Sequence, residues 1–160
     1  MLNYRSLTAD DDAVLASIIR TSLEQMHLNL PGTAYSDPEL DHLSAYYARE
    51  PKKRTYFVAL DDAGQVVGGV GVAEFAPIPN CAEIQKLYLS DAVRGKGYSK
   101  ELMRLVETWS REAGYRQLYL ETHSNLQIAI KLYKKLGFTE IERPKEVLHS
   151  TMDHFYIKRL

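Results

Sequence analysis

Two glycines and two basic residues stand directly before a helical pattern in the segment 91–103, DAVRGKGYSKELM. Glycine lets the backbone turn tightly and come close to a ligand, as Gly95 and Gly97 would here. The free N–H groups of a helix's first turn, together with the positive end of the helix dipole, attract anions. Arg94 and Lys96 add positive charge to this turn. These residues therefore predict a phosphate-binding turn, and the alternative is a solvated turn that happens to carry two basic side chains.

Two common phosphate-binding motifs are excluded by the residues around these glycines. A Walker P-loop requires Gly-Lys-Ser/Thr at its end, and neither glycine is followed by that pair. A Rossmann fingerprint requires a third glycine where this sequence has Lys100. What remains is Gly-x-Gly between an expected strand and an expected helix.

A second pattern lies further along the chain, in NLQIAIKLYKKLGF. Asn125, Ala129, Tyr133 and Gly137 recur at intervals of four, which places the first three along one stripe of an expected helix. A core stripe that ends at a glycine cap would explain the alanine and the glycine. The asparagine and the tyrosine are less expected from side-chain packing alone.

Together the two segments resemble the GCN5-related N-acetyltransferase (GNAT) superfamily. Its coenzyme A loop is written Gln/Arg-x-x-Gly-x-Gly/Ala, and its later helix ends in a run like Tyr133–Phe138. Aligned on Gly95 and Gly97, the Gln/Arg position of the loop is Ala92, so that side chain's contribution is missing and Arg94 would partly replace it. The resemblance covers nearly the whole chain.

The periodicity of the chain predicts the elements that must position these residues. Apolar alternation and turn signals predict strands, and apolar residues three and four apart predict helices. Ser36 and Asp37 are expected to cap a short second helix, with Pro38 and Glu39 in its first turn. The strands are expected at 3–7, 55–60, 66–75, 81–89, 117–122, 139–142 and 152–160, and the helices over 8–26, from 36 or 37 to 47, over 98–113 and over 125–136.

The order β-α-α-β-β-β-α-β-α-β-β predicts an α/β fold with a mixed sheet. The resemblance sharpens this to a single-domain GNAT fold over residues 1–160. Its sheet would be mostly antiparallel, splayed between strands 4 and 5, and flanked by about four helices. No internal repeat, linker or low-complexity segment divides the 160 residues.

Composition excludes several other classes of protein. Twenty basic side chains against 21 acidic ones argue against a nucleic-acid protein with a strong electrostatic footprint. The single cysteine, Cys81, cannot form an intramolecular disulfide, which favours a cytoplasmic location, and a plain buried thiol is preferred to a nucleophile. No apolar run approaches the roughly 20 residues of a membrane span, and the start of the chain does not read as a signal peptide. The five histidines are too scattered to suggest a metal site.

The resemblance implies that acetyl-CoA lies between strands 81–89 and 117–122 as the acetyl donor. Backbone groups of strand 81–89 would pair with the pantetheine arm, backbone N–H groups of the glycine turn would hold the pyrophosphate, and a residue at the later helix would bind the pantetheine side. The cofactor-binding residues expected in this way are Leu87, Tyr88, Leu89, Arg94, Gly95, Lys96, Gly97, Tyr98, Ser99 and Asn125.

The implied reaction is direct attack of an amine on the thioester. Tyr133 matches the family's general acid, since a tyrosine stays protonated at neutral pH and can protonate the leaving thiolate. Glu83 is the first candidate for the general base because it lies near the start of the central strand. His123 is the second candidate because its ordinary pKa is suited to proton transfer, and water is the third.

The acceptor is expected to bind beside the segment from Met26 to Tyr47, where Tyr35, Tyr46 and Tyr47 would frame a small pocket. Asp37, Glu39 and Asp41 could attract a cation there, although capping and solvation are the preferred roles of the first two. The leading function is acetyl transfer to a small-molecule amine or amino acid. The alternatives are a protein N-terminal or lysine acetyltransferase and a non-catalytic acetyl-CoA-binding sensor or interaction module, with a nucleotide-binding regulator a remote third. Homodimers are frequent in the superfamily, but no feature of this sequence requires one.

Overall fold

The computed structural model describes residues 1–160, which form seven strands and four α-helices in the expected order. The strands are β1 (Asn3–Ser6), β2 (Arg54–Leu60), β3 (Val66–Glu74), β4 (Cys81–Leu89), β5 (Gln117–Thr122), β6 (Thr139–Ile141) and β7 (His154–Arg159). The helices are α1 (Asp12–Gln25), α2 (Leu43–Ala48), α3 (Tyr98–Glu112) and α4 (Gln127–Lys135), with short 3-10 turns η1 (Ala9–Asp11), η2 (Ala34–Ser36), η3 (Leu40–His42) and η4 (Asp91–Val93).

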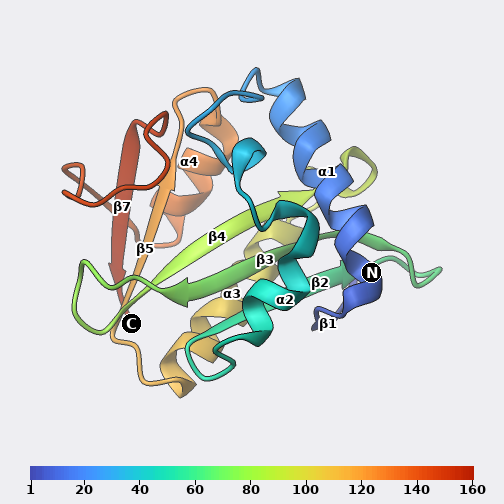
Figure 1. Cartoon of the computed structure of the whole chain (residues 1–160), viewed down its shortest axis with the longest axis horizontal. Helices are drawn as coiled ribbons and strands as arrows, with labels where there is room; N and C mark the ends of the chain where they lie inside the picture. The colour runs from blue at the N-terminus through green and yellow to red at the C-terminus, as the bar shows by residue number, and fades with distance from the viewer.

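All seven strands join one sheet in the order β1-β2-β3-β4-β5-β7-β6. The pairing of β4 with β5 is parallel, whereas every other pairing is antiparallel. The parallel ladder joins only Cys81–Glu83 to Gln117–Tyr119, and the two strands then diverge (Figure 1). The expected mixed, mostly antiparallel sheet that splays between the fourth and fifth strands is therefore confirmed.

Helices cover both faces of the sheet (Figure 1). Helices α1 and α2 lie on one face, which we call the front, and their apolar residues enclose Tyr56 and Val58 of β2. Helices α3 and α4 lie on the back, where Leu102, Val106 and Tyr133 pack against the aliphatic residues of the central strands. No helix in the chain is both long and apolar enough to span a bilayer.

One extra residue in β4 changes which side chains face the front. The register with β3 shifts between Gly69 and Gly71, and Lys86 has a positive φ of 50°. Alternation along a regular strand would place Lys86 on the same face as Ile84. Because of this bulge, the Lys86 side chain instead joins Gln85 at the front, where Asp37 contacts it.

Neighbouring residues hold this bulge in place. Tyr56 of β2 is buried, and its hydroxyl donates a hydrogen bond of 3.0 Å to the carbonyl oxygen of Lys86. Gly71 of β3 lies opposite Gln85, and its missing side chain leaves the space that the Tyr47 ring and hydroxyl occupy. The front of the sheet at β4 is therefore shaped by two buried tyrosines and one glycine.

Two expected helix starts are wrong. The second helix begins at Leu43 rather than near Pro38, and residues 34–42 form two 3-10 turns instead. Ser36 and Asp37 therefore do not cap it. Asp37 instead forms ion pairs with Lys86 and His149, which are far along the chain. The last helix begins at Gln127, so that Asn125 lies in the turn before it rather than in its first turn.

We predict that Gly71→Ala lowers the free energy of unfolding by about 3 kcal/mol, because a methyl group there would overlap the buried rings of Tyr47 and Tyr56. Gly64→Ala is the control. Gly64 has a positive φ of 78° but open space around it, so it should cost only about 1 kcal/mol. Urea denaturation of both variants measures the difference, and equal losses would contradict the assigned role of Gly71.

Candidate functional site

The candidate site lies where β4 and β5 separate. Glu83 and Tyr119 form the last pair of the parallel ladder, so Glu83 stands at the fork between the two strands. Tyr133 of α4 packs into the apolar cluster on the back of the sheet, whereas the side chain of Glu83 contacts Gln85 on the front. The two expected catalytic residues therefore lie on opposite faces of the sheet.

The glycine turn lies at the end of β4 and opens directly into α3. Gly95 and Gly97 have positive φ angles of 75° and 84°, a conformation that other residues rarely adopt. A Cβ atom at either position would meet no atom within 4 Å, so the backbone conformation rather than crowding requires glycine. Gly97 is the N-cap of α3, and no side chain caps that helix. The first N–H groups of α3 are therefore available to an anion.

The two basic side chains of this turn bind to the protein itself. The guanidinium group of Arg94 donates hydrogen bonds to the Leu89 carbonyl oxygen at 2.8 Å and to Ser22 Oγ at 2.7 Å. Lys96 Nζ donates to the carbonyl oxygen of Ala92 at 3.2 Å. The Arg94 side chain thus ties α1 to the end of β4, and its expected contact with the ligand stays a prediction. The motif Gln/Arg-x-x-Gly-x-Gly/Ala also fits residues 94–99, with serine at its last position, and in that register the arginine is present.

Asn125 joins this region to α1. Its side-chain amide donates a hydrogen bond of 2.9 Å to the carbonyl oxygen of Met26, just after the last residue of α1. Its backbone N–H donates to His123 Nδ1 at 3.1 Å. Asn125 therefore connects the turn before α4 to the end of α1, and its role in ligand binding stays a prediction.

Tyr133 is buried among the aromatic residues of the back face. Its ring centroid lies 6.1 Å from that of Phe138 and 6.3 Å from that of Tyr156. Burial alone raises the pKa of the Tyr133 hydroxyl to about 12. The hydroxyl therefore stays protonated at neutral pH, as a general acid requires.

Glu83 has the environment of a carboxylate that titrates near neutral pH. Burial and the nearby charge of Glu121 raise the pKa of Glu83 to about 7, against the opposing influence of Gln85, His149 and Lys86. The amide of Gln85 donates a hydrogen bond of 2.7 Å to Glu83 Oε1. A group with this pKa can both accept and release a proton at neutral pH.

The structure adds a charged network that sequence reasoning missed. His149 lies in the loop between β6 and β7, and its Nε2 is 2.7 Å from Asp37 Oδ1 while its Nδ1 is 3.1 Å from Glu121 Oε1. The Nζ atom of Lys86 lies 2.7 Å from Asp37 Oδ2 and 3.5 Å from Glu39 Oε1. The preference for capping and solvation is therefore wrong for Asp37, whose side chain is 12% exposed between two cations, whereas Glu39 stays partly solvated at 27% exposure beside Lys86.

This network joins segments that are distant in the sequence. His149 and Asp37 are 112 residues apart, so no local pattern could have revealed their contact. Burial would lower the pKa of His149, but its bonds to Asp37 and Glu121 raise it to about 10. His149 is therefore a cation at neutral pH.

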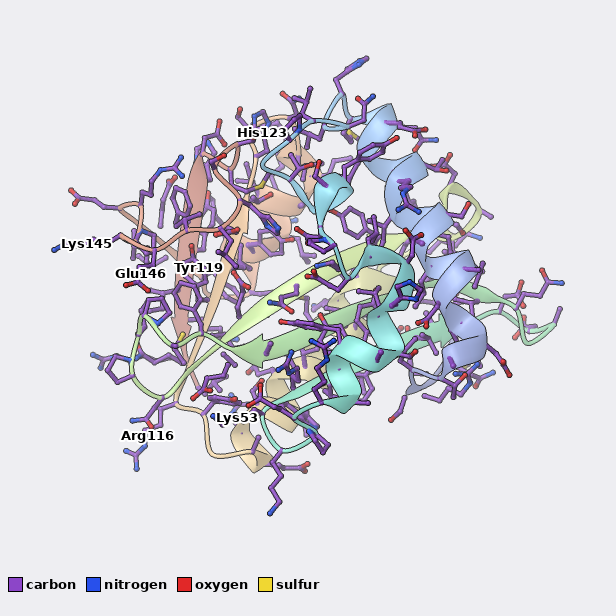
Figure 2. The ribbon with its side chains drawn as sticks, viewed as in Figure 1. Lys53, Arg116, Tyr119, His123, Lys145 and Glu146 are labelled. Atoms are coloured by element: carbon purple, nitrogen blue, oxygen red, sulfur yellow. The ribbon has the colours of Figure 1, made fainter.

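His123 and Cys81 lie outside this network, whereas the Tyr119 hydroxyl donates a hydrogen bond of 3.0 Å to Glu121 Oε2 within it. Figure 2 shows Tyr119 midway along β5 beside the loop that carries Lys145 and Glu146, whereas His123 lies at the upper end of the strand. His123 Nε2 is 3.9 Å from Asp153 Oδ2, and its other ring nitrogen accepts the Asn125 N–H. The thiol of Cys81 is buried, which raises its pKa to about 12, in agreement with the expectation of an unreactive cysteine. No group of histidine, cysteine and carboxylate side chains in the chain could hold a metal ion.

Comparison with known proteins identifies the family. The model of the acetyltransferase (GNAT) family matches residues 20–138, which include the fork, the glycine turn and Tyr133. The chain belongs to the GNAT acetyltransferase family. It is 36% identical over 140 residues to the uncharacterized N-acetyltransferase YjgM of Escherichia coli (strain K12), a match that covers 86% of this chain and 82% of the relative.

Solved GNAT structures share the whole fold. An acetyltransferase of the GNAT family from Staphylococcus aureus Mu50 superposes with a TM-score of 0.86 at 18% identity and covers 99% of both chains. The PaiA N-acetyltransferase of Thermoplasma acidophilum, solved in complex with coenzyme A, superposes with a TM-score of 0.79 at 18% identity over 100% of this chain and 99% of that one. At such identities these neighbours establish the fold of this GNAT protein and leave its acceptor open.

We predict that His149→Ala destabilises this GNAT protein by about 1–3 kcal/mol at neutral pH, because the imidazolium bonds to Asp37 and Glu121 are lost. A folded-state pKa raised from 6.5 to about 10 contributes stability that is complete below pH 6.5 and is lost as the pH rises through 10. The difference from the unmodified protein should therefore shrink across that range.

Urea denaturation at a series of pH values measures this effect. Leu148→Ala is the matched control, since Leu148 directly precedes His149 in the same loop but is 94% exposed. A loss of stability in His149→Ala that stays the same at every pH would show that the imidazolium charge does not hold the loop.

Proposed function

We propose that residues 1–160 form a single N-acetyltransferase domain that moves the acetyl group of acetyl-CoA to the amine of a small molecule or amino acid. The observation that carries this proposal is the fork between β4 and β5, which ends at the uncapped N-terminus of α3. An extended thiol-bearing arm fits between two diverging strands, and its pyrophosphate end fits free backbone N–H groups. The coenzyme A complex of the structural neighbour PaiA supports the same choice of donor.

In this proposal the backbone of Leu87, Tyr88 and Leu89 pairs with the pantetheine arm as a further strand would. Beyond Glu83, β4 has no ladder partner in β5, so the strand edge is free for such pairing. The turn that binds the pyrophosphate consists of Arg94, Gly95, Lys96, Gly97, Tyr98 and Ser99, acting through backbone N–H groups. Asn125 contributes from the turn before α4.

The protein's own groups divide the proton transfers between the two faces of the sheet. Glu83 accepts a proton from the acceptor ammonium, which frees the nitrogen lone pair to attack the acetyl carbonyl carbon. A backbone N–H near Leu89 donates to the carbonyl oxygen as negative charge develops on it. The bond between carbon and sulfur then breaks, and Tyr133 donates its proton to the departing sulfur. The product nitrogen loses its second proton to solvent, from which Tyr133 regains its own, so that a neutral amide and a free thiol leave the site.

The acceptor enters from the front, between the α1–α2 loop and the β6–β7 loop. Thr151 of the second loop donates both its backbone N–H and its hydroxyl to carbonyl oxygens of the first, at Gly32 and Pro31. Of the tyrosines expected to frame the pocket, Tyr47 contacts Gln85 behind Glu83, whereas the Tyr35 hydroxyl donates to Glu24 on α1. Two loops that bond to each other across the front favour a small acceptor over a protein chain.

Release of free coenzyme A thiol from acetyl-CoA tests the function across amino acids, polyamines, aminoglycosides and short peptides. Transfer to a small amine would support the proposal, and transfer only to peptides would assign the protein to the N-terminal or lysine acetyltransferases. Binding of acetyl-CoA without transfer to any amine, peptides included, would identify an acetyl-CoA-binding module instead.

Tyr133→Phe should lower kcat by about 100- to 10,000-fold, because the leaving thiolate loses its proton donor. The affinity for acetyl-CoA, measured by calorimetry, should change little since the ring and its burial are retained. Tyr115→Phe is the control, because the Tyr115 hydroxyl donates to the Lys53 carbonyl oxygen away from the fork. Unchanged kcat in Tyr133→Phe would remove this residue from the mechanism.

The ionisation of Glu83 predicts the pH dependence of the reaction. A base with a pKa of about 7 is protonated below neutral pH, so kcat/KM should rise with pH through 7 and then level off. Glu83→Gln should abolish that rise and lower the plateau by about 100-fold. If the pH profile of Glu83→Gln keeps the same inflection, another group or water is the base.

A further inference from the structure

We infer that Gln85, oriented by Tyr47, is a positioning residue that favours the carboxylate form of Glu83 and fixes the direction of that carboxylate. The inference deepens the proposed function, because it rests on Glu83 as the base of the acetyl transfer. It assigns roles to two front-face residues that do not themselves touch the reacting atoms.

The two hydrogen bonds form a directed chain. The Tyr47 hydroxyl lies 2.8 Å from Gln85 Oε1, and Gln85 Nε2 lies 2.7 Å from Glu83 Oε1. A side-chain amide has one accepting end and one donating end. When Tyr47 donates to the oxygen, the nitrogen must face Glu83 and donate to it. A carboxylate is the form of Glu83 that accepts this bond best.

Tyr47 is fixed as a donor by its surroundings. Only 5% of the residue is exposed, and burial raises its pKa well above the ordinary value of 10, so the hydroxyl keeps its proton. Its ring stands edge-on to Tyr46 at a centroid distance of 4.9 Å and lies 5.3 Å from Tyr56. Gly71 provides the space for the hydroxyl next to Gln85. The orientation of the amide is therefore set by rigid packing and not by solvent.

The other groups around Glu83 oppose one another. Burial and Glu121 of β5 disfavour the carboxylate, whereas His149 of the β6–β7 loop and Lys86 of β4 favour it. Both cations are already bound to other carboxylates, at Asp37, Glu39 and Glu121. Cys81 and Tyr119 are also close, and both are neutral because their pKa values are raised.

Within this balance Gln85 is the one side chain that donates directly to Glu83. The bond engages only Oε1, so Oε2 remains for the acceptor ammonium. A fixed Oε1 also fixes the plane of the carboxylate and hence the direction of Oε2. The chain of hydrogen bonds from Tyr47 through Gln85 to Glu83, which we call the relay, thereby favours the charged form of the base and sets the direction of Oε2.

The test measures the Glu83 carboxyl directly, by titration of its ¹³C signal in the unliganded protein, with the signal assigned from Glu83→Gln. In Gln85→Met, which keeps the length of the side chain but removes the donor, the Glu83 pKa should rise by about one unit. In Tyr47→Phe it should rise by less, since the amide remains but is free to turn. Gln117→Met is the control, because Gln117 of β5 donates to the Pro79 carbonyl oxygen at the far end of the sheet and should leave the titration unchanged.

The pH dependence of the rate should shift in the same direction as the Glu83 pKa. The inflection of kcat/KM against pH should move upward by the same amount in Gln85→Met, while the KM for acetyl-CoA stays unchanged. Should Gln85→Met fail to fold, Tyr47→Phe retains the packed ring and supplies the same test. The inference is overturned if the Glu83 titration curve of Gln85→Met coincides with that of the unmodified protein, whatever the activity. If only Tyr47→Phe folds, the same comparison is made with that variant.

The hydrogen-bond relay and the role of Glu83 as the base can be refuted separately. A Glu83 pKa that rises while the pH profile of the rate stays in place would uphold the relay and refute Glu83 as the base. A uniform loss of activity at every pH with an unmoved Glu83 titration would show a merely structural role for Gln85 and would overturn the relay.

Discussion

Two parallel strands that separate after three residue pairs leave backbone groups without partners, and the rest of this structure is arranged around that fork. Divergence creates an opening in the middle of a sheet that is otherwise continuous from β1 to β6. Helix α4 packs on the back of the central strands, and on the front the α1–α2 and β6–β7 loops are hydrogen-bonded to each other. The glycine turn and the N-terminus of α3 stand at one end of it. A site with two faces is therefore a direct consequence of the sheet geometry.

The bulge in β4 decides which chemistry each face receives. Regular alternation would have kept Leu87 and Leu89 on the same face as Glu83 and Gln85. With the extra residue, both leucines join the apolar core at the back, whereas Lys86 turns to the front and meets Asp37. One inserted residue thus separates an apolar wall from a polar one, and the Tyr56 hydroxyl holds the strained turn in place.

On the front face each buried cation is paired with carboxylates, so no cation is left unpaired beside Glu83. The side chain of Lys86 is only 4% exposed, and burial of such a charge is tolerated because Asp37 and Glu39 accept hydrogen bonds from its ammonium group. The His149 imidazolium is stabilised in the same way by Asp37 and Glu121. Burial and Glu121 raise the pKa of Glu83 most, and among the groups that oppose them the Gln85 amide acts more strongly than either bound cation. The ion pairs also join the α1–α2 loop, β4, β5 and the β6–β7 loop into one wall.

Local rules of the sequence determined the order of the elements, the bounds of β4 and β5, the phosphate-type turn and the position of Tyr133 one turn before Gly137. Each of these depends on periodicity or on the φ angles that glycine permits, and both are readable over a few neighbouring residues. Only the tertiary structure decided the start of α2, the direction of Arg94, and the contacts of His149 and Gln85. These depend on distances between residues far apart in the chain and on a bulge that reverses the alternation of β4, and no local propensity encodes either one.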